Sequence, residues 1–139
     1  MYADKAEMLK RYREDDLIAL TDRAEPFTGA IVDAVLEAAL EDAAALIDTY
    51  ISKRYNLPVA SVPGALKVQA CAIAYYTLHQ GRYPEETRKA YEDALSFLQK
   101  VADGKVHLDV GGSQPKSAPA DARVDGPDQT FNRDTLKGF

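Results

Sequence analysis

The chain has 139 residues, of which 46% are hydrophobic and 28% charged, and it carries a net charge of −5. These values are typical of a soluble globular protein with one hydrophobic core, large enough for one domain but not for two. Residues 1–60 hold 12 acidic and 7 basic side chains and so contain the whole acidic excess, which argues against a nucleic-acid surface, because phosphate binding requires concentrated positive charge.

The N-terminal part predicts two short helices. Asp4 and Glu7 have the spacing of a capping box, which predicts that the first helix begins at Asp4. The second helix is predicted at Glu14–Thr21, with acidic residues in its first turn, where the helix dipole favours them. Pro26 and Gly29 then predict a loop.

A long amphipathic helix follows and is the strongest periodic signal in the chain. Its apolar residues recur every three or four positions from Val32 to Ile51, so they form one stripe that faces a core. We expect this helix to begin near Ala30. Asn56 and Pro58 are expected to end it, because asparagine tolerates a left-handed conformation and proline disfavours helical backbone at the preceding residue.

Two further helices are predicted to begin at prolines. Pro63 starts a helix over Gly64 to about His79 that holds a single charged residue, so this helix is predicted to be the buried centre of the fold. Pro84 starts another helix, which Gly104 ends. The predicted fold class is therefore all-α, a small bundle of four to five helices around one long helix.

The sequence changes character after Gly104. Lys105–Val110 alternates between polar and apolar residues, which predicts a short strand, whereas the composition of Gly111–Asp128 predicts a flexible tether. The last eleven residues regain apolar side chains and predict a docking arm, whose interaction residues are Phe131, Arg133, Leu136 and Phe139. The chain thus divides into a helical domain at 1–104 and a strand, tether and arm at 105–139.

No residue pattern predicts a catalytic site, a cofactor site or a metal site. Cys71 and His79 are separated by about 12 Å of helical rise, too far to share a metal ion or a proton, and His107 lies in another element. We interpret Cys71 as a small core residue and His79 as a helix-end residue. Adjacent acids such as Glu41 and Asp42 point about 100° apart on a helix and face water. We therefore expect no enzyme activity and no cofactor.

The cellular compartment follows from the same residues. The single cysteine cannot form an internal disulfide, and no basic-then-apolar leader begins the chain, which predicts a reducing cytoplasmic origin. No apolar run approaches the roughly 20 residues needed to cross a bilayer, so no membrane partner is expected.

Several tyrosines fall on the predicted helices or at their ends. An aromatic cluster of this kind could be a platform on which nucleic-acid bases stack, but no basic groove accompanies it. Packing between the helices is therefore the preferred interpretation. The residues concerned are Tyr50, Tyr55, Tyr75, Tyr76 and Tyr91.

The chain resembles the Mu-like phage neck proteins most clearly at residues 43–58, AAALIDTYISKRYNLP. This family was formerly classed as a domain of unknown function and is related to the head-tail connector, or adaptor, proteins of tailed phages. The opening residues, the run at 72–78 and the final nine residues also resemble it, so the resemblance covers nearly the whole chain. The signature residues are Ile47, Tyr50, Arg54, Tyr55 and Pro58.

The resemblance implies a structural connector subunit that forms a ring, of twelve copies when assembled, on the portal vertex of a filled capsid. Its partners would be the portal protein and tail-completion or tail-terminator proteins, and DNA would pass through the channel without sequence-specific binding. The subunit would occupy the virion neck after assembly in the host cytoplasm. The residues alone leave an alternative open, a small cytoplasmic adaptor or regulatory protein that binds a partner through its C-terminal peptide.

Overall fold

The computed structural model describes residues 1–111, which form five α-helices and no strand. This confirms the predicted all-α class. None of these five helices is long and apolar enough to cross a membrane. The helices are α1 (Lys5–Arg11), α2 (Glu14–Thr21), α3 (Asp33–Ile51), α4 (Gly64–Leu78) and α5 (Glu85–Ala102).

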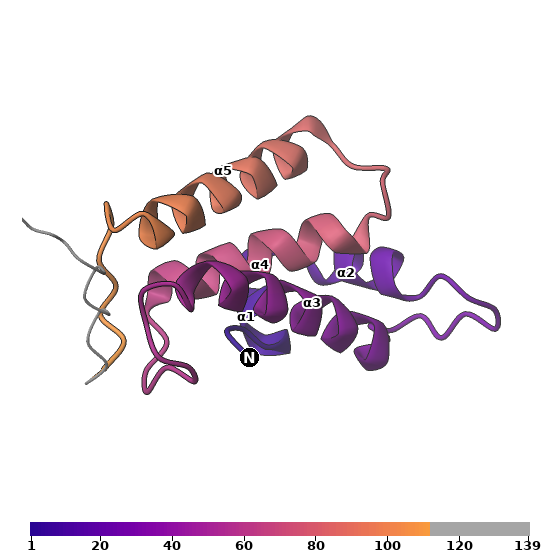
Figure 1. Ribbon diagram of the computed structural model, residues 1–139. Coiled ribbons are helices and arrows are strands. Elements are labelled where there is room, and N and C mark those ends of the chain that lie inside the picture. Colours follow the sequence, from indigo (N-terminus) through magenta and orange to yellow (C-terminus); the bar gives the residue numbers. More distant parts are fainter. Residues whose placement is uncertain (112–139) are drawn as a thin grey trace, which may run out of the picture.

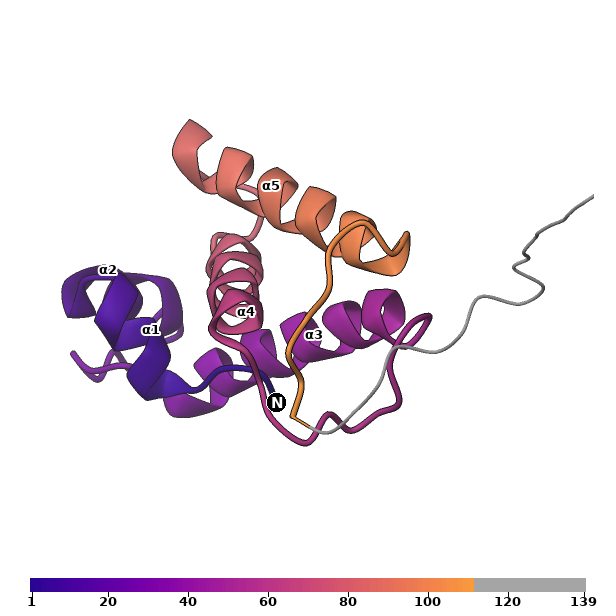
Figure 2. The same cartoon turned by 90° about the vertical axis from the view of Figure 1, so that its left-hand side faces the viewer.

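Helix α4 lies at the centre of the bundle, as its apolar sequence predicts. It packs against α3 and α5, and α1 packs on both α3 and α4 (Figure 1). In Figure 2, where α4 is seen nearly end-on, α1 and α2 lie on one side of it and α5 on another. Nearly the whole length of α4 contributes to the core, through Leu66, Ala70, Cys71, Ala72, Ile73, Ala74 and Leu78.

The short α1 is held by side chains at both ends. Asp4 accepts a hydrogen bond from the backbone N–H of Glu7 at 3.0 Å, so the predicted N-cap is confirmed. The Glu7 carboxylate does not complete a capping box but pairs with Arg11 at 2.5 Å and Lys10 at 3.3 Å. These are pairs within one helix, worth a few tenths of a kcal/mol each.

Helix α3 begins and ends at residues other than those predicted. It begins at Asp33 rather than near Ala30, because Val32 is held extended with its N–H donating to Thr21 Oγ1 at 3.0 Å. It ends at Ile51 rather than at Asn56, which does not adopt the left-handed conformation. The residues after Ile51 instead turn so that the side chain of Tyr55 enters the core.

The predicted strand at Lys105–Val110 is not confirmed. This segment runs beside the connection between α3 and α4 (Figure 2), and among residues 1–111 the two share one backbone hydrogen bond, from Ser61 N–H to Val110 O at 3.1 Å. A ladder requires repeated pairs, so no strand forms. The alternation itself is nevertheless real, since Val106, Leu108 and Val110 pack on the bundle while the intervening side chains are exposed.

Candidate functional site

The five signature residues lie at the C-terminal end of α3 and in the connection that follows it. Ile47 and Tyr55 are fully buried, Tyr50 and Arg54 are half-buried, and Pro58 is exposed. The structure therefore gathers them at one end of the bundle but does not aim them at a common ligand. Ile47, Tyr50 and Tyr55 pack in the core. Arg54, Tyr55 and Pro58 also belong to two local features described below.

The first feature holds the last described residues, 104–111, against the end of α3 and the connection that follows it. The hydroxyl of Tyr55 accepts a hydrogen bond from Leu108 N–H at 2.8 Å, and the Arg54 guanidinium lies against Gly104, where an added Cβ would be 2.8 Å from Arg54 Nη1. Gly104 has a φ of +81°, which also favours glycine. With the bond between Ser61 and Val110, these contacts form what we call the exit anchor (Arg54, Tyr55, Ser61, Gly104, Leu108 and Val110).

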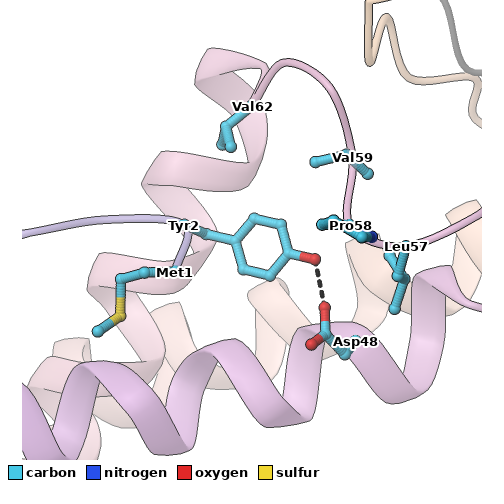
Figure 3. A pocket seen from close by; sticks show the side chains of 7 residues that line it. All are labelled: Met1, Tyr2, Asp48, Leu57, Pro58, Val59 and Val62. Carbon is cyan, nitrogen blue, oxygen red and sulfur yellow. Dashed lines mark hydrogen bonds between the residues drawn. The ribbon is translucent and has the colours of Figure 1, made fainter.

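The second feature is a pocket of about 330 Å³ beside the exit anchor (Figure 3). In it the Tyr2 hydroxyl points toward α3 and donates a hydrogen bond to the Asp48 carboxylate. Burial, and then this bond to a negative charge, raise the pKa of Tyr2, so the hydroxyl remains a donor at neutral pH. We call this the terminal pocket, lined by Met1, Tyr2, Asp48, Leu57, Pro58, Val59 and Val62.

The terminal pocket shares lining residues with a neighbouring hollow of about 430 Å³. Met1, Tyr2 and Val62 line both, and the hollow also includes Ser61 of the exit anchor. The N-terminus, the end of α3 and the last described residues therefore lie close together at one surface.

Cys71 and His79, the candidates for a metal or nucleophilic site, have roles in packing and helix capping. Cys71 is fully buried, and burial raises the pKa of its thiol to about 11. His79 is the C-cap of α4, with its Nδ1 2.8 Å from Tyr75 O. Within residues 1–111, no group of three or more His, Cys, Asp and Glu side chains is arranged to hold a metal ion.

Several tyrosines pack on one another. Tyr76 stacks on Tyr91 with ring centroids 3.9 Å apart, which joins α4 to α5 as the packing interpretation predicts. Tyr75 stacks on Tyr12 at 3.8 Å and so joins α4 to the end of α1. Tyr83 contacts Tyr76 at 4.7 Å. Each stacked pair covers ring faces that a nucleic-acid base would need.

Part of this site can be predicted from the sequence. The predicted arm residues Phe131, Arg133, Leu136 and Phe139 lie outside the part of the chain that the structure describes. Tyr2 was missed, because its partner Asp48 is 46 residues away and no local pattern joins them. Asp48 itself carried a signal, because it lies in the run at 43–58, between Ile47 and Tyr50.

Comparison with known proteins decides the family. The family described as "Bacteriophage Mu, Gp36" matches residues 2–125. The chain belongs to this family. "Mu-like prophage FluMu protein gp36" of Haemophilus influenzae is 34% identical over 142 residues, covering 100% of this chain and 98% of that protein. "Gene product J" of Escherichia phage Mu is 38% identical over 104 residues, covering 75% of this chain and 73% of that protein.

The predicted membership of a Mu-like phage family is thus confirmed. The matched residues of this Gp36-family protein include all five helices, the exit anchor and nearly all of the terminal pocket. The family match stops at residue 125, before Phe131, whereas the alignment with the Haemophilus protein also covers the C-terminal peptide.

Proposed function

We propose that this Gp36-family protein is a head-tail connector subunit, which forms a ring on the portal vertex and bridges the DNA-filled head to the tail. Family membership is the observation that carries the proposal, because the neck proteins that the chain resembles at residues 43–58 are related to phage connector proteins. The role is structural, and we assign no catalytic step to it.

The architecture suits a subunit of this kind. A ring subunit needs a rigid body and an element that grips a neighbour or the portal. The packed α3, α4 and α5 supply the body, and the exit anchor gives the C-terminal segment a fixed starting point at its edge. The 19 residues from 112 to 130 can span up to about 65 Å when extended. This exceeds the roughly 28 Å length of α3, so the C-terminal arm can reach an adjacent subunit.

The assembled subunit would lie in the virion neck as a ring of twelve copies, with the portal protein on one side and tail-completion or tail-terminator proteins on the other. DNA would pass through the ring without sequence-specific binding. A channel wall that carries carboxylates repels phosphate and lets DNA slide. Exposed carboxylates are available for such a wall on α2, at Glu14, Asp15 and Asp16.

The test is a mass measurement on the purified full-length chain mixed with its portal protein. The connector proposal predicts one symmetric complex that contains a portal ring and twelve copies of this chain. A small adaptor protein would instead give a low-order complex with another partner and no ring. Failure of the chain to bind the portal at micromolar concentration would overturn the proposal.

A further inference from the structure

We infer that the terminal pocket is the docking site for the C-terminal peptide, residues 129–139, of a neighbouring copy of this chain. The inference rests on the proposed ring and names the surface that the arm grips. The terminal pocket would bind the apolar peptide at the end of the sequence, which contains Phe131, Leu136 and Phe139.

The rim of the terminal pocket exposes apolar side chains that a docked peptide would cover. Met1 is 61% exposed and Leu57 is 38% exposed, and both are among the few large hydrophobic residues left in contact with water on residues 1–111. Val59 and Val62 line the pocket between them. Exposed apolar groups gathered at a hollow are characteristic of a surface that binds another segment.

Asp48 of the terminal pocket is complementary in charge to Arg133 of the peptide. Asp48 is the one charged side chain among the residues that line it, and no lysine or arginine within residues 1–111 forms an ion pair with Asp48. The peptide carries Arg133 between Phe131 and Leu136. An arginine beside a partly buried carboxylate forms a charge-assisted hydrogen bond, so the peptide offers a cation for Asp48 as well as apolar groups for the rim.

The exit anchor places the start of the arm at the same surface. Gly111 lies against Ser61, where an added Cβ would be 2.7 Å from Ser61 Cβ, and Ser61 lies next to Val62 of the terminal pocket. An arm that leaves here and enters the equivalent pocket of the next copy makes a head-to-tail contact. Head-to-tail contacts of this kind form a ring when the rotation from one copy to the next closes, which is the assembly proposed above.

Charge reversal tests the contact between Asp48 and Arg133 in the full-length chain. Asp48→Arg and Arg133→Asp should each raise the concentration at which half of the protein is assembled by about tenfold or more, which corresponds to about 1.4 kcal/mol per interface. The double variant should return to the wild-type value. Glu41→Arg on the exposed face of α3 is the matched control and should assemble normally. If Asp48→Arg does not fold, Asp48→Asn removes the charge and keeps an acceptor for Tyr2.

Single variants that assemble like the wild type, or a double variant no better than the singles, would show that these two residues do not meet. Either result would overturn the assignment of this pocket. Circular dichroism on each variant separates loss of assembly from loss of folding.

Photo-crosslinking identifies the occupant directly. A benzoylphenylalanine replaces Leu57 in the terminal pocket or, as control, the exposed Val68 of α4, which lies outside it. Equal amounts of isotope-labelled and unlabelled full-length protein are mixed before assembly, and the crosslinked peptides are identified by mass spectrometry. We expect position 57, and not position 68, to crosslink to residues 129–139, with labelled and unlabelled chains joined.

Crosslinks only within one chain would show that the peptide folds back on its own pocket, and crosslinks to the portal would show a different occupant. Each result would overturn the inference while leaving the connector proposal intact. If rings form normally and position 57 captures no C-terminal peptide, the pocket is not the docking site. If no ring forms with the portal, it is the proposed function that fails.

Discussion

The hydroxyl of Tyr55 accepts a hydrogen bond from the backbone N–H of Leu108 at 2.8 Å, joining the end of α3 to a residue 53 positions further along the chain. Tyr55 is 1% exposed, so little water can replace this bond. The contact ends the turn after α3 and holds the segment after α5 at the same time. It therefore links the run at residues 43–58 to the last residues that the structure describes.

Tyr55→Phe should remove the hydrogen bond to Leu108 without leaving a cavity in the core. The ring remains, but the Leu108 N–H loses its acceptor, which costs about 1–2 kcal/mol in a partly buried position. Chemical denaturation followed by circular dichroism measures the loss, and hydrogen exchange of residues 105–111 should accelerate. Tyr50→Phe is the control, since Tyr50 also packs on the core but no hydrogen bond of its hydroxyl is found within residues 1–111. Equal stability of the two variants would show that the bond to Leu108 contributes nothing.

Ile47→Ala should be among the more costly single changes in the signature. Ile47 is fully buried on the inner stripe of α3, and removing its methylenes leaves a cavity that costs about 2–5 kcal/mol. The matched change Glu37→Ala lies on the exposed face of the same helix and should be nearly silent. A loss below about half a kcal/mol for Ile47→Ala would mean that this face of α3 is not packed as described.

Local sequence signals predicted the elements that local interactions determine. Asp4 caps α1 and Gly104 follows α5, as the sequence predicts. Pro63 and Pro84 mark the starts of α4 and α5, although each is the extended N-cap residue and the helix begins one position later than predicted. These residues act through their own backbone conformation or through a hydrogen bond to a near neighbour. Their effect is therefore visible in a short window of sequence.

The features that the sequence did not predict depend on contacts between residues far apart in the chain. The start of α3 follows from the bond between Thr21 and Val32, and its end coincides with the burial of Tyr55 rather than with the local stop at Asn56. The alternation after Gly104 correctly predicted which side chains of residues 105–110 pack on the bundle. No strand forms, because the connection between α3 and α4 shares only one backbone hydrogen bond with this segment within residues 1–111. The contact between Tyr2 and Asp48 could not be read from either stretch alone.

Alkaline pH should destabilise the fold through Tyr12. Burial raises the pKa of this tyrosine to about 12, above its ordinary value of about 10. Between these values the unfolded chain ionises Tyr12 and the folded chain does not, so stability present below about pH 10 is lost as the pH rises toward about 12. Tyr12→Phe keeps the stacking on Tyr75 and should flatten this part of the stability curve, measured by urea denaturation at several pH values. An unchanged slope would exclude Tyr12 as a cause.

Cys71 should resist thiol reagents in the folded protein. It is fully buried and its raised pKa keeps it protonated at neutral pH, whereas the thiolate is the reactive form. The rate of labelling by a disulfide reagent should therefore be limited by opening of the bundle. The destabilised Ile47→Ala variant should accordingly react faster than the wild type. Rapid labelling of the native wild-type protein would contradict the placement of Cys71 in the core.

The C-terminal arm provides the most direct test of the connector role. A chain that ends at Gly111 keeps all five helices and the exit anchor, so its circular dichroism per helical residue should match that of the full chain. Without the arm it should bind its neighbours and the portal more weakly. Unfolding of the shortened chain would instead show that the arm packs on its own bundle.

The deciding measurement is the mass of the complex formed when the full chain, and separately the chain ending at Gly111, is added to the portal ring. We expect twelve copies per portal ring for the full chain and markedly fewer for the shortened chain at the same concentration. A full chain that adds no ring of subunits to the portal would contradict the connector role. A shortened chain that assembles as completely as the full one would show that the arm is not an assembly element.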